Sequence, residues 1–453
     1  MTLIEDSAAL ATFCKALARV DYVALDTEFM RESTFWPQLC LVQLAGPDEA
    51  MAIDPLAPGI DLQPLFDLMA NRRVLKVMHG GRQDMEIFHH LSGELPNPVF
   101  DTQVAAMVAG FGDQVGYETL IARLTGHGLD KSSRFTDWSL RPLSQRQLDY
   151  ALGDVTHLRE AYEKLRARIE AADRMDWVAE EMAVFEDPAT YRLDPPNAWR
   201  RLKPRTGDRR QLAVLQAIAA WREDEASTRD LPRNRIVRDE ALLEIAAHPP
   251  KSAADLGRIR GISRGFAEGR LAASLLAAVE RGLALPPAEA PEPPPRPVVA
   301  RGVGPLTDLF KVLLKLRCEE WDVAQKLVAS SDDLQAIAGD DEADVPALSG
   351  WRRELFGNDA LALKHGRLAL AADGRQVVLV PVEGGSATAP QPVRPAAGNG
   401  GGNGAGGDDG EGRTRRKRRR RRRRGGNGDG AAEAATPEVP AGEATPPSAS
   451  ETA

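Results

Sequence analysis

The stretch Val23-Ala24-Leu25-Asp26-Thr27-Glu28-Phe29 decides how the first part of the chain is interpreted. Its apolar residues are typical of a β-strand, in which successive side chains point to opposite faces of a sheet. The first, third, fifth and seventh residues then share one face, and Asp26 and Glu28 share the other. Two carboxylates so close repel each other unless a proton or a cation lies between them, and a divalent metal ion is the usual solution. By itself the pair also fits a solvated edge strand with exposed acidic residues.

A second pattern is VLKVMHGGRQDMEIFHHL at residues 74–91, which predicts a strand ending at His79, a Gly80-Gly81 turn and a helix. On this helix Asp84 shares a face with Ile87, Phe88 and Leu91. A carboxylate that points the same way as apolar residues needs a partner to offset its desolvation, and a metal ion would serve. An acidic residue favoured by the dipole of a first helical turn is the alternative.

A third pattern begins at residues 144–147, where the sequence SQRQ resembles a capping box and predicts a long helix that continues to about Ala172. Tyr150 and Asp154 are four residues apart, so a phenol and a carboxylate project side by side from one turn. A surface Tyr and Asp joined by hydrogen bonding is the alternative. The predicted core stripe of this helix consists of Leu148, Leu152, Val155, Leu158, Tyr162, Leu165 and Ile169.

The ordered set of DxE on the first strand, Asp at the start of a later helix and YxxxD on the last helix resembles the ribonuclease D family of DEDDy 3′ to 5′ exonucleases. The resemblance is carried by Asp26–Phe29 with Trp36–Leu39, His79–Gly80 with Asp84, Phe100–Gln103, Leu129–Lys131 with Thr136–Trp138, and Tyr150 with Asp154. It implies an α/β, ribonuclease H-like catalytic domain, with a mixed sheet flanked by helices. The short apolar strands that alternate with helical stretches in residues 1–172 agree with that fold class.

The resemblance also implies the chemistry of the site. Asp26, Glu28, Asp84 and Asp154 would hold two divalent cations, Mg²⁺ or Mn²⁺, which suit hard oxygen ligands. Asp26 would bridge both ions, Glu28 and Asp154 would complete one site, Asp84 would support the other, and Tyr150 would orient the attacking water. The implied reaction releases nucleoside 5′-monophosphates from the 3′ ends of precursor tRNA and other small structured RNAs.

Two other functions are considered beside this one. A DNA-directed exonuclease of the same superfamily would use the same metal chemistry, and only contact to the 2′-hydroxyl separates the two. A non-catalytic RNA-binding scaffold is disfavoured by the intact carboxylate set. Lys131 and Trp138 are either contacts for a phosphate and a terminal base or, for Trp138, packing against the long helix. His79 is interpreted as a structural residue at a strand end.

The rest of the chain is predicted to contain two helical units before its tail. Residues 173–206 form a connector, 207–284 resemble an HRDC domain, 285–300 form a Pro-rich linker, 301–382 form a second HRDC-like all-helical domain, and 383–453 form a disordered tail. The second helical unit is acidic, so we expect it to position the catalytic domain rather than to bind RNA. The HRDC residues that either contact phosphates or lie on a solvated surface are Arg233, Arg235, Arg238, Arg258 and Arg260.

The charge of the chain is unevenly distributed. Residues 413–424 hold eleven of the 58 Lys and Arg residues, which leaves 47 basic against 66 acidic residues elsewhere. This run predicts a nucleic-acid tether, with a nuclear localisation signal or an intramolecular contact to the acidic body as alternatives. Three widely spaced cysteines suggest neither disulfides nor a zinc site. Without an apolar stretch of membrane-spanning length, we expect a cytoplasmic protein with RNA as its partner, and no protein partner is predicted.

Overall fold

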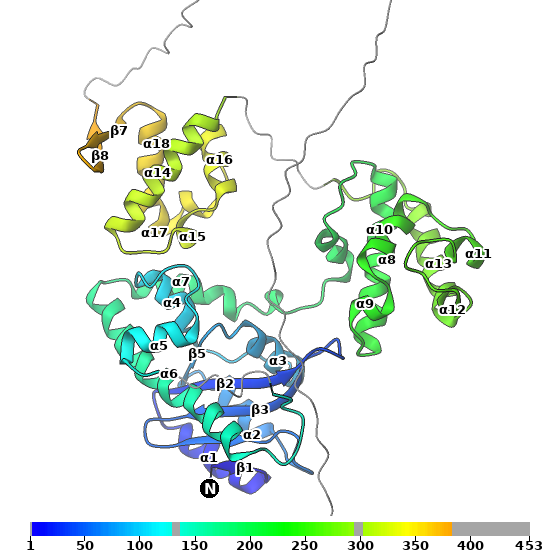
Figure 1. Cartoon of the computed structure of the whole chain (residues 1–453), viewed down its shortest axis with the longest axis horizontal. Coiled ribbons are helices and arrows are strands. Elements are labelled where there is room, and N and C mark those ends of the chain that lie inside the picture. The colour runs from blue at the N-terminus through cyan, green and yellow to red at the C-terminus, as the bar shows by residue number, and fades with distance from the viewer. Residues whose placement is uncertain (1, 129–135, 294–301, 383–453) are drawn as a thin grey trace, which may run out of the picture. The chain divides into compact units, whose positions relative to one another are not determined.

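The computed structural model of the chain describes residues 2–128, 136–293 and 302–382 (Figure 1). The predictions made for Lys131 and for the arginine-rich tail lie outside these residues. Among the helices that the structure describes, none has the combination of length and apolar character that a membrane crossing needs.

The first part of the chain is built on a six-stranded mixed sheet with the strand order β1-β4-β3-β2-β5-β6. Its strands are β1 (Leu3–Ile4), β2 (Tyr22–Met30), β3 (Gln38–Ala45), β4 (Ala50–Ile53), β5 (Leu75–Met78) and β6 (Val99–Asp101). The central strand β2 pairs antiparallel with β3 and parallel with β5. Because it has neighbours on both sides, the alternative of an edge strand for the DxE motif is wrong. A register shift between Glu28 and Phe29 bends the strand just beyond the second carboxylate.

The two faces of β2 are covered by different helices, as its alternating sequence predicts. Val23 and Leu25 pack with α1 (Ser7–Leu17), α2 (Gln63–Ala70) and α3 (Arg82–Ser92) in one apolar cluster. Ala24 packs in a second cluster on the other face, together with α4 (Thr102–Val108), α5 (Tyr117–Thr125), α6 (Gln145–Ala171) and α7 (Met175–Glu186). Asp26 and Glu28 follow Ala24 on the strand, so this arrangement directs both carboxylates to the side of α6, which lies across β2 and β3 (Figure 1).

The long helix α6 begins and ends close to the predicted residues. Both halves of the capping box between Ser144 and Gln147 are present, and the helix ends at Ala171. Six of the seven residues of the predicted stripe are buried, as are Ala151 and Ala161, whereas Leu152 is half-buried. On α3 the shared face is shorter than predicted. Leu91 is 45% exposed because it lies in the last turn, beyond the sheet-facing residues Asp84, Ile87 and Phe88.

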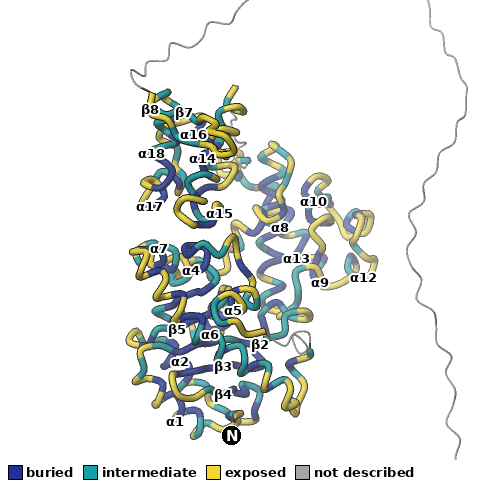
Figure 2. Tube along the Cα trace, turned by 60° about the vertical axis from the view of Figure 1, so that its left-hand side comes forward, coloured by how far each residue is buried: buried dark blue, intermediate teal, exposed yellow. Residues whose placement is uncertain are grey.

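After α7 the chain passes through the 3₁₀ segments η1 (Pro188–Thr190) and η2 (Pro195–Leu202) into a helical group. The group consists of α8 (Arg209–Thr228), α9 (Arg233–Ile236), α10 (Asp239–Ala247), α11 (Ala253–Leu256), α12 (Arg264–Ala267) and α13 (Arg270–Ala284). Its apolar core centres on α8, as the dark tube of that helix in Figure 2 shows. Phe35, from the loop between β2 and β3, belongs to the same core and is 3% exposed.

A second helical group follows, with a core formed by Phe310, Leu313, Leu314 and Cys318 of α14 and by its neighbours. It consists of α14 (Gly304–Glu320), α15 (Gln325–Val328), α16 (Ser331–Gly339), η3 (Pro346–Leu348), α17 (Gly350–Arg352), η4 (Arg353–Gly357) and α18 (Asn358–Lys364). Leu306, one turn before Phe310 on α14, lies half-buried at the edge of this core.

The prediction of an all-helical unit up to residue 382 is wrong at its end. Strands β7 (Leu368–Asp373) and β8 (Gln376–Pro381) form an antiparallel hairpin. The valine-rich second strand favours β structure, and Gly374, with φ of 62°, supplies the conformation that a two-residue turn requires at its first position.

Candidate active site

Four carboxylates converge where β2, α3 and α6 meet. Carboxylate oxygens of Asp26, Glu28 and Asp154 all lie within 4.8 Å of one another, although 126 residues separate the last two in the sequence. Asp84, in the first turn of α3, is 8% exposed and accepts a hydrogen bond from the Thr27 hydroxyl of β2. The structure therefore brings together the acidic residues that the sequence patterns identified one by one.

The electrostatics of this cluster explain what it can bind. Burial raises the pKa of Asp26 well above its usual value, and the nearby charges of Asp154, Asp84 and Glu28 raise it further. Burial also raises the pKa of Asp84 to about 6. Carboxylates that lie this close together need a neutralising cation, and clustered carboxylate oxygens suit hard divalent ions. The acidic cluster, set in this fold, indicates the use of divalent metal ions.

The turn before α3 is held by a residue that sequence reasoning had assigned no role of its own. Asp101, at the end of β6, is 2% exposed and accepts hydrogen bonds from the amides of Gly80 at 3.1 Å and Gly81 at 2.8 Å. The same carboxylate caps α4 through two further amides. One buried acid thus ties β6 and α4 to the turn that sets the position of Asp84, which gives the Phe100–Gln103 motif a structural reason.

Tyr117, the first residue of α5, was not singled out from the sequence. Its hydroxyl donates a hydrogen bond to the main-chain carbonyl of Asp154. Burial raises the pKa of Tyr117, and Asp154, Asp26 and Tyr150 raise it further, so the phenol stays protonated beside the carboxylates. Nothing in the spacing of VGYETL at 115–120 distinguishes this tyrosine. Its proximity to Asp154 arises only from the packing of α5 against α6.

Two residues with aromatic rings near the site, Trp138 and His79, have structural roles. Trp138 is 2% exposed and packs with Leu148 and Ala151 of α6, so the packing alternative for this residue is correct. Its ring centroid lies 6.1 Å from that of Tyr150, which is half-buried. His79 lies at the end of β5 with Nδ1 3.0 Å from the Thr102 hydroxyl, and burial lowers its pKa, in agreement with a structural residue.

The HRDC arginines differ in their surroundings. Arg233 is held by Glu223 and lies over the Phe35 ring, with 4.3 Å from its guanidinium carbon to the ring centroid. The four other candidates are exposed, and Arg258 forms a long ion pair of 3.4 Å with Asp255. Sequence alone does not make this distinction.

Comparison with known proteins agrees with this geometry. A family model described as a 3′–5′ exonuclease matches residues 1–170, and an HRDC domain model matches residues 211–279. The mixed sheet with flanking helices and the acidic cluster on β2, α3 and α6 define the class: a ribonuclease H-like 3′ to 5′ exonuclease that carries an HRDC domain.

The relatives narrow the class further. The chain is 56% identical over 380 residues to ribonuclease D of Granulibacter bethesdensis, covering 84% of this chain and 96% of the relative. It is 54% identical to ribonuclease D of Gluconacetobacter diazotrophicus, with the same two coverages. The crystal structure of Escherichia coli RNase D matches with a TM-score of 0.70 and 32% identity, over 80% of this chain and 98% of that one. The chain belongs to the ribonuclease D family and is a 3′ to 5′ exoribonuclease.

Proposed function

We propose that Asp26, Glu28, Asp84 and Asp154 hold two divalent ions, Mg²⁺ or Mn²⁺, at the reacting end of the RNA. The close approach of three carboxylates supports one shared site with Asp26 as its central ligand. Asp84 comes from α3 and is held by its hydrogen bond with Thr27 of β2, so it is placed to support a second ion. When bound, such a pair of ions makes a water molecule nucleophilic and neutralises the charge that develops on the phosphate.

In this proposal Tyr150 orients the attacking water. It projects from α6 one turn before Asp154, and its half-buried ring lies 6.1 Å, centroid to centroid, from that of Trp138. A phenol in that place directs the water oxygen toward the last phosphodiester bond, so that cleavage releases a nucleoside 5′-monophosphate. Tyr117 holds the main chain of Asp154 from the opposite helix. We assign it a positioning role.

We further propose that the substrates are 3′ extensions of precursor tRNA and other small structured RNAs, processed in the cytoplasm. The Escherichia coli relative is described as an exoribonuclease involved in structured RNA processing. The proposed division of labour assigns catalysis to residues 1–172, RNA contacts to the HRDC domain at 207–284, and positioning of the catalytic domain to residues 301–382. The positioning role is supported by contacts between residues 301–382 and α7, such as the ion pair between Arg352 and Glu180 at 2.6 Å.

The test is degradation of single-stranded RNA and DNA of matched sequence, each labelled at the 3′ or the 5′ end. We expect RNA to shorten from its 3′ end with Mg²⁺ or Mn²⁺ and to stay intact with a chelator. Asp26→Asn is expected to lower the rate by more than about 100-fold, whereas the exposed Asp21→Asn leaves it unchanged. Tyr150→Phe is expected to lower kcat by about 100-fold with unchanged metal affinity.

Each alternative has its own outcome in this assay. Equal or faster cleavage of DNA would favour the DNA-directed exonuclease, because only an RNA-specific site distinguishes the 2′-hydroxyl. No cleavage with either metal would favour the binding scaffold. A Tyr150→Phe variant with unchanged kcat would contradict the role given to that phenol.

A further inference from the structure

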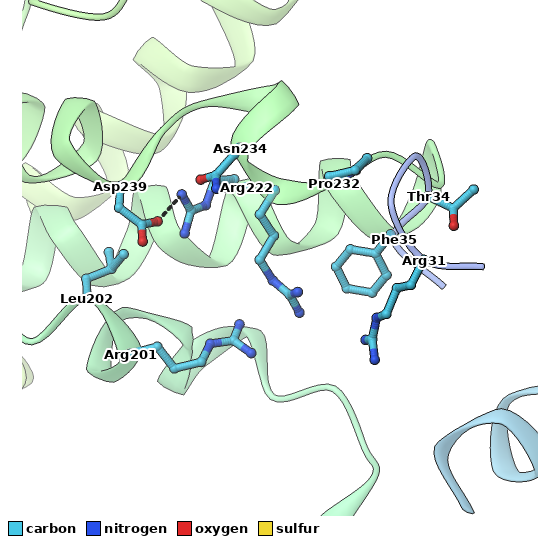
Figure 3. Close-up of a pocket in the computed structure, with 10 residues that line it drawn as sticks. Arg31, Thr34, Phe35, Arg201, Leu202, Arg222, Pro232, Asn234 and Asp239 are labelled. Carbon is cyan, nitrogen blue, oxygen red and sulfur yellow. Dashed lines mark hydrogen bonds and ion pairs between the residues drawn. The ribbon is translucent and has the colours of Figure 1, made fainter. Parts of the chain in front are cut away.

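An arginine-rich pocket lies between the loop after β2 and the helical group that contains the HRDC domain. Its volume is about 390 Å³. Arg31 and Phe35 come from the loop, and Arg201 of η2 and Arg222 of α8 come from the helical side (Figure 3). Arg233 of α9 also lines the pocket on the helical side. We call this set of four arginines the arginine pocket. One acidic residue, Asp239, is among the residues that line it.

Carboxylates hold these guanidinium groups in fixed orientations. Glu223, with a side chain 2% exposed, accepts hydrogen bonds from Arg233 at 2.7 Å and from Arg201 at 2.8 Å. Although burial alone would raise the pKa of Glu223, the two arginines bring it below its usual value, so the anchor is ionised. Glu86 holds Arg31 through two parallel bonds of 2.8 Å.

The arginines retain donors beyond those that the carboxylates use. Arg222 is 5% exposed, and its Nη1 donates to Asp239 at 2.6 Å and to a main-chain carbonyl. Its buried Nε has no hydrogen-bond partner among the described residues. The Arg201 side chain is 58% exposed and gives one of its five N–H groups to Glu223. Four guanidinium groups against three anchoring carboxylates leave a positive balance, and planar guanidinium forks match phosphate geometry.

The loop wall of the pocket is fixed to the helical wall. The Asp230 carboxylate accepts hydrogen bonds from the amides of Phe35 at 3.0 Å and Trp36 at 2.9 Å. Phe35 is buried in the helical core, and Arg233 covers its ring. Binding an anion here therefore requires no assembly of the two walls. Rigid placement of this kind lowers the entropy cost of binding.

The pocket also has a defined relation to the acidic cluster. Arg31 follows Glu28 by three residues on β2 and its immediate extension, which corresponds to roughly 10 Å of extended chain. A polyanion whose 3′ end lies at the carboxylates has its next few phosphates within reach of this end of the strand. In a chain that carries 66 acidic against 47 basic residues outside 413–424, such a cluster of guanidinium groups offers an RNA backbone local attraction.

We propose that the arginine pocket binds a backbone phosphate of the RNA upstream of the nucleotide that is being removed. This inference rests on the proposed function, because it takes the acidic cluster as the position of the RNA 3′ end. The ligand is a phosphodiester that belongs to the substrate chain. Free inorganic phosphate shares its chemistry, so the experiment must separate the two.

The test uses the full chain with Arg201→Ala, which removes the most exposed guanidinium and leaves Glu223 paired with Arg233. Arg264→Ala is the matched control, since Arg264 is an exposed HRDC arginine, paired with Glu268 at 2.8 Å, outside the pocket. Binding of a ten-nucleotide RNA in chelator is expected to weaken about tenfold for Arg201→Ala alone. The slope of log affinity against log salt should fall by about 0.7, the value for one phosphate contact on a single strand.

Substrate length and a second variant complete the test. The one phosphodiester of a dinucleotide is the bond that is cleaved, which leaves no upstream phosphate for the pocket. Its kcat/KM should therefore be unchanged in Arg201→Ala, while that of the ten-nucleotide RNA falls about tenfold. Arg31→Gln, on the opposite wall, should reproduce this pattern if Arg201→Ala does not fold. The proposal would be overturned by unchanged RNA binding in Arg201→Ala, or by an equal loss of RNA affinity in Arg264→Ala. It would also be overturned by an equal loss of kcat/KM with the dinucleotide, or if Arg201→Ala lost binding of inorganic phosphate alone. Absence of cleavage by the unmodified chain would instead overturn the proposed catalysis, since binding in chelator is measured separately.

Discussion

Replacing Asp84 by asparagine separates the energetic cost of the acidic site from its chemistry. Burial raises the pKa of this carboxyl from 3.8 to about 6. One pKa unit corresponds to about 1.4 kcal/mol, so ionised Asp84 destabilises the folded, metal-free protein by about 3 kcal/mol at pH 8. Asparagine keeps the size of the side chain and an acceptor for the Thr27 hydroxyl without the charge. We expect Asp84→Asn to raise the melting temperature of the catalytic domain by about 6–12 °C while it abolishes activity.

The pH dependence of this gain has a definite sign. Because the pKa of Asp84 is higher in the folded state, its favourable contribution is complete below pH 3.8, the unfolded value, and is lost as pH rises through 6. The advantage of Asp84→Asn should thus be largest at pH 8 and should shrink by about half at pH 5. Thermal unfolding followed by circular dichroism in chelator, at both pH values, measures it directly.

Two comparisons make the experiment decisive. Asp67→Asn changes an exposed carboxylate on α2 and should shift stability by less than about 0.5 kcal/mol. Added Mg²⁺ should stabilise Asp84→Asn less than the unmodified protein, because the variant keeps the carboxylates of Asp26, Glu28 and Asp154 and loses a ligand of the second ion. If Asp84→Asn melts at or below the temperature of the unmodified protein in chelator at pH 8, the assigned cost of burying this charge is wrong.

Two further substitutions test how the site is positioned. In Gly81→Ala the new Cβ would lie 2.6 Å from a methionine sulfur of β5, so we expect a loss of about 1–3 kcal/mol in unfolding free energy and a lower kcat. Gly116→Ala, with no atom that close, is the control. Equal melting temperatures of the two variants would refute the steric reason. Tyr117→Phe removes a hydrogen bond to the main chain of α6 and should cost about 1 kcal/mol and reduce kcat more than it changes KM. A change in KM alone would contradict its positioning role.

Much of the catalytic domain follows from local sequence patterns. The alternation around Asp26 and Glu28 set their common face, and the Ser144 capping box set the start of α6. Both depend on periods of two and 3.6 residues and on caps, which act within one element. The placement of Asp154 beside β2 also needed the relation between elements, and the family resemblance supplied it.

Features that depend on long-range packing were not predictable in the same way. Asp101 holds Gly80 and Gly81 from a strand twenty residues further along the chain, and Tyr117 reaches Asp154 from another helix. Neither contact leaves a periodic signal in the sequence. The terminal hairpin was missed for a different reason: its turn begins at Gly374, a local signal that a uniformly helical interpretation of residues 301–382 passed over.

The arginines show why residue type and net charge are insufficient guides to RNA contacts. Arg233 was predicted as a phosphate contact of the HRDC domain, yet its position depends on the buried Glu223. Glu223 also orients Arg201, which lies outside the HRDC domain. Charge is also segregated along one short segment: Glu28 lies in the acidic cluster, and Arg31 comes three residues later in the arginine pocket. The reacting end of a polyanionic substrate thus meets carboxylates that require cations. The upstream part of the same substrate meets guanidinium groups. An overall acidic body is compatible with RNA binding because attraction between charges is set at distances of a few ångströms and is screened beyond about 10 Å.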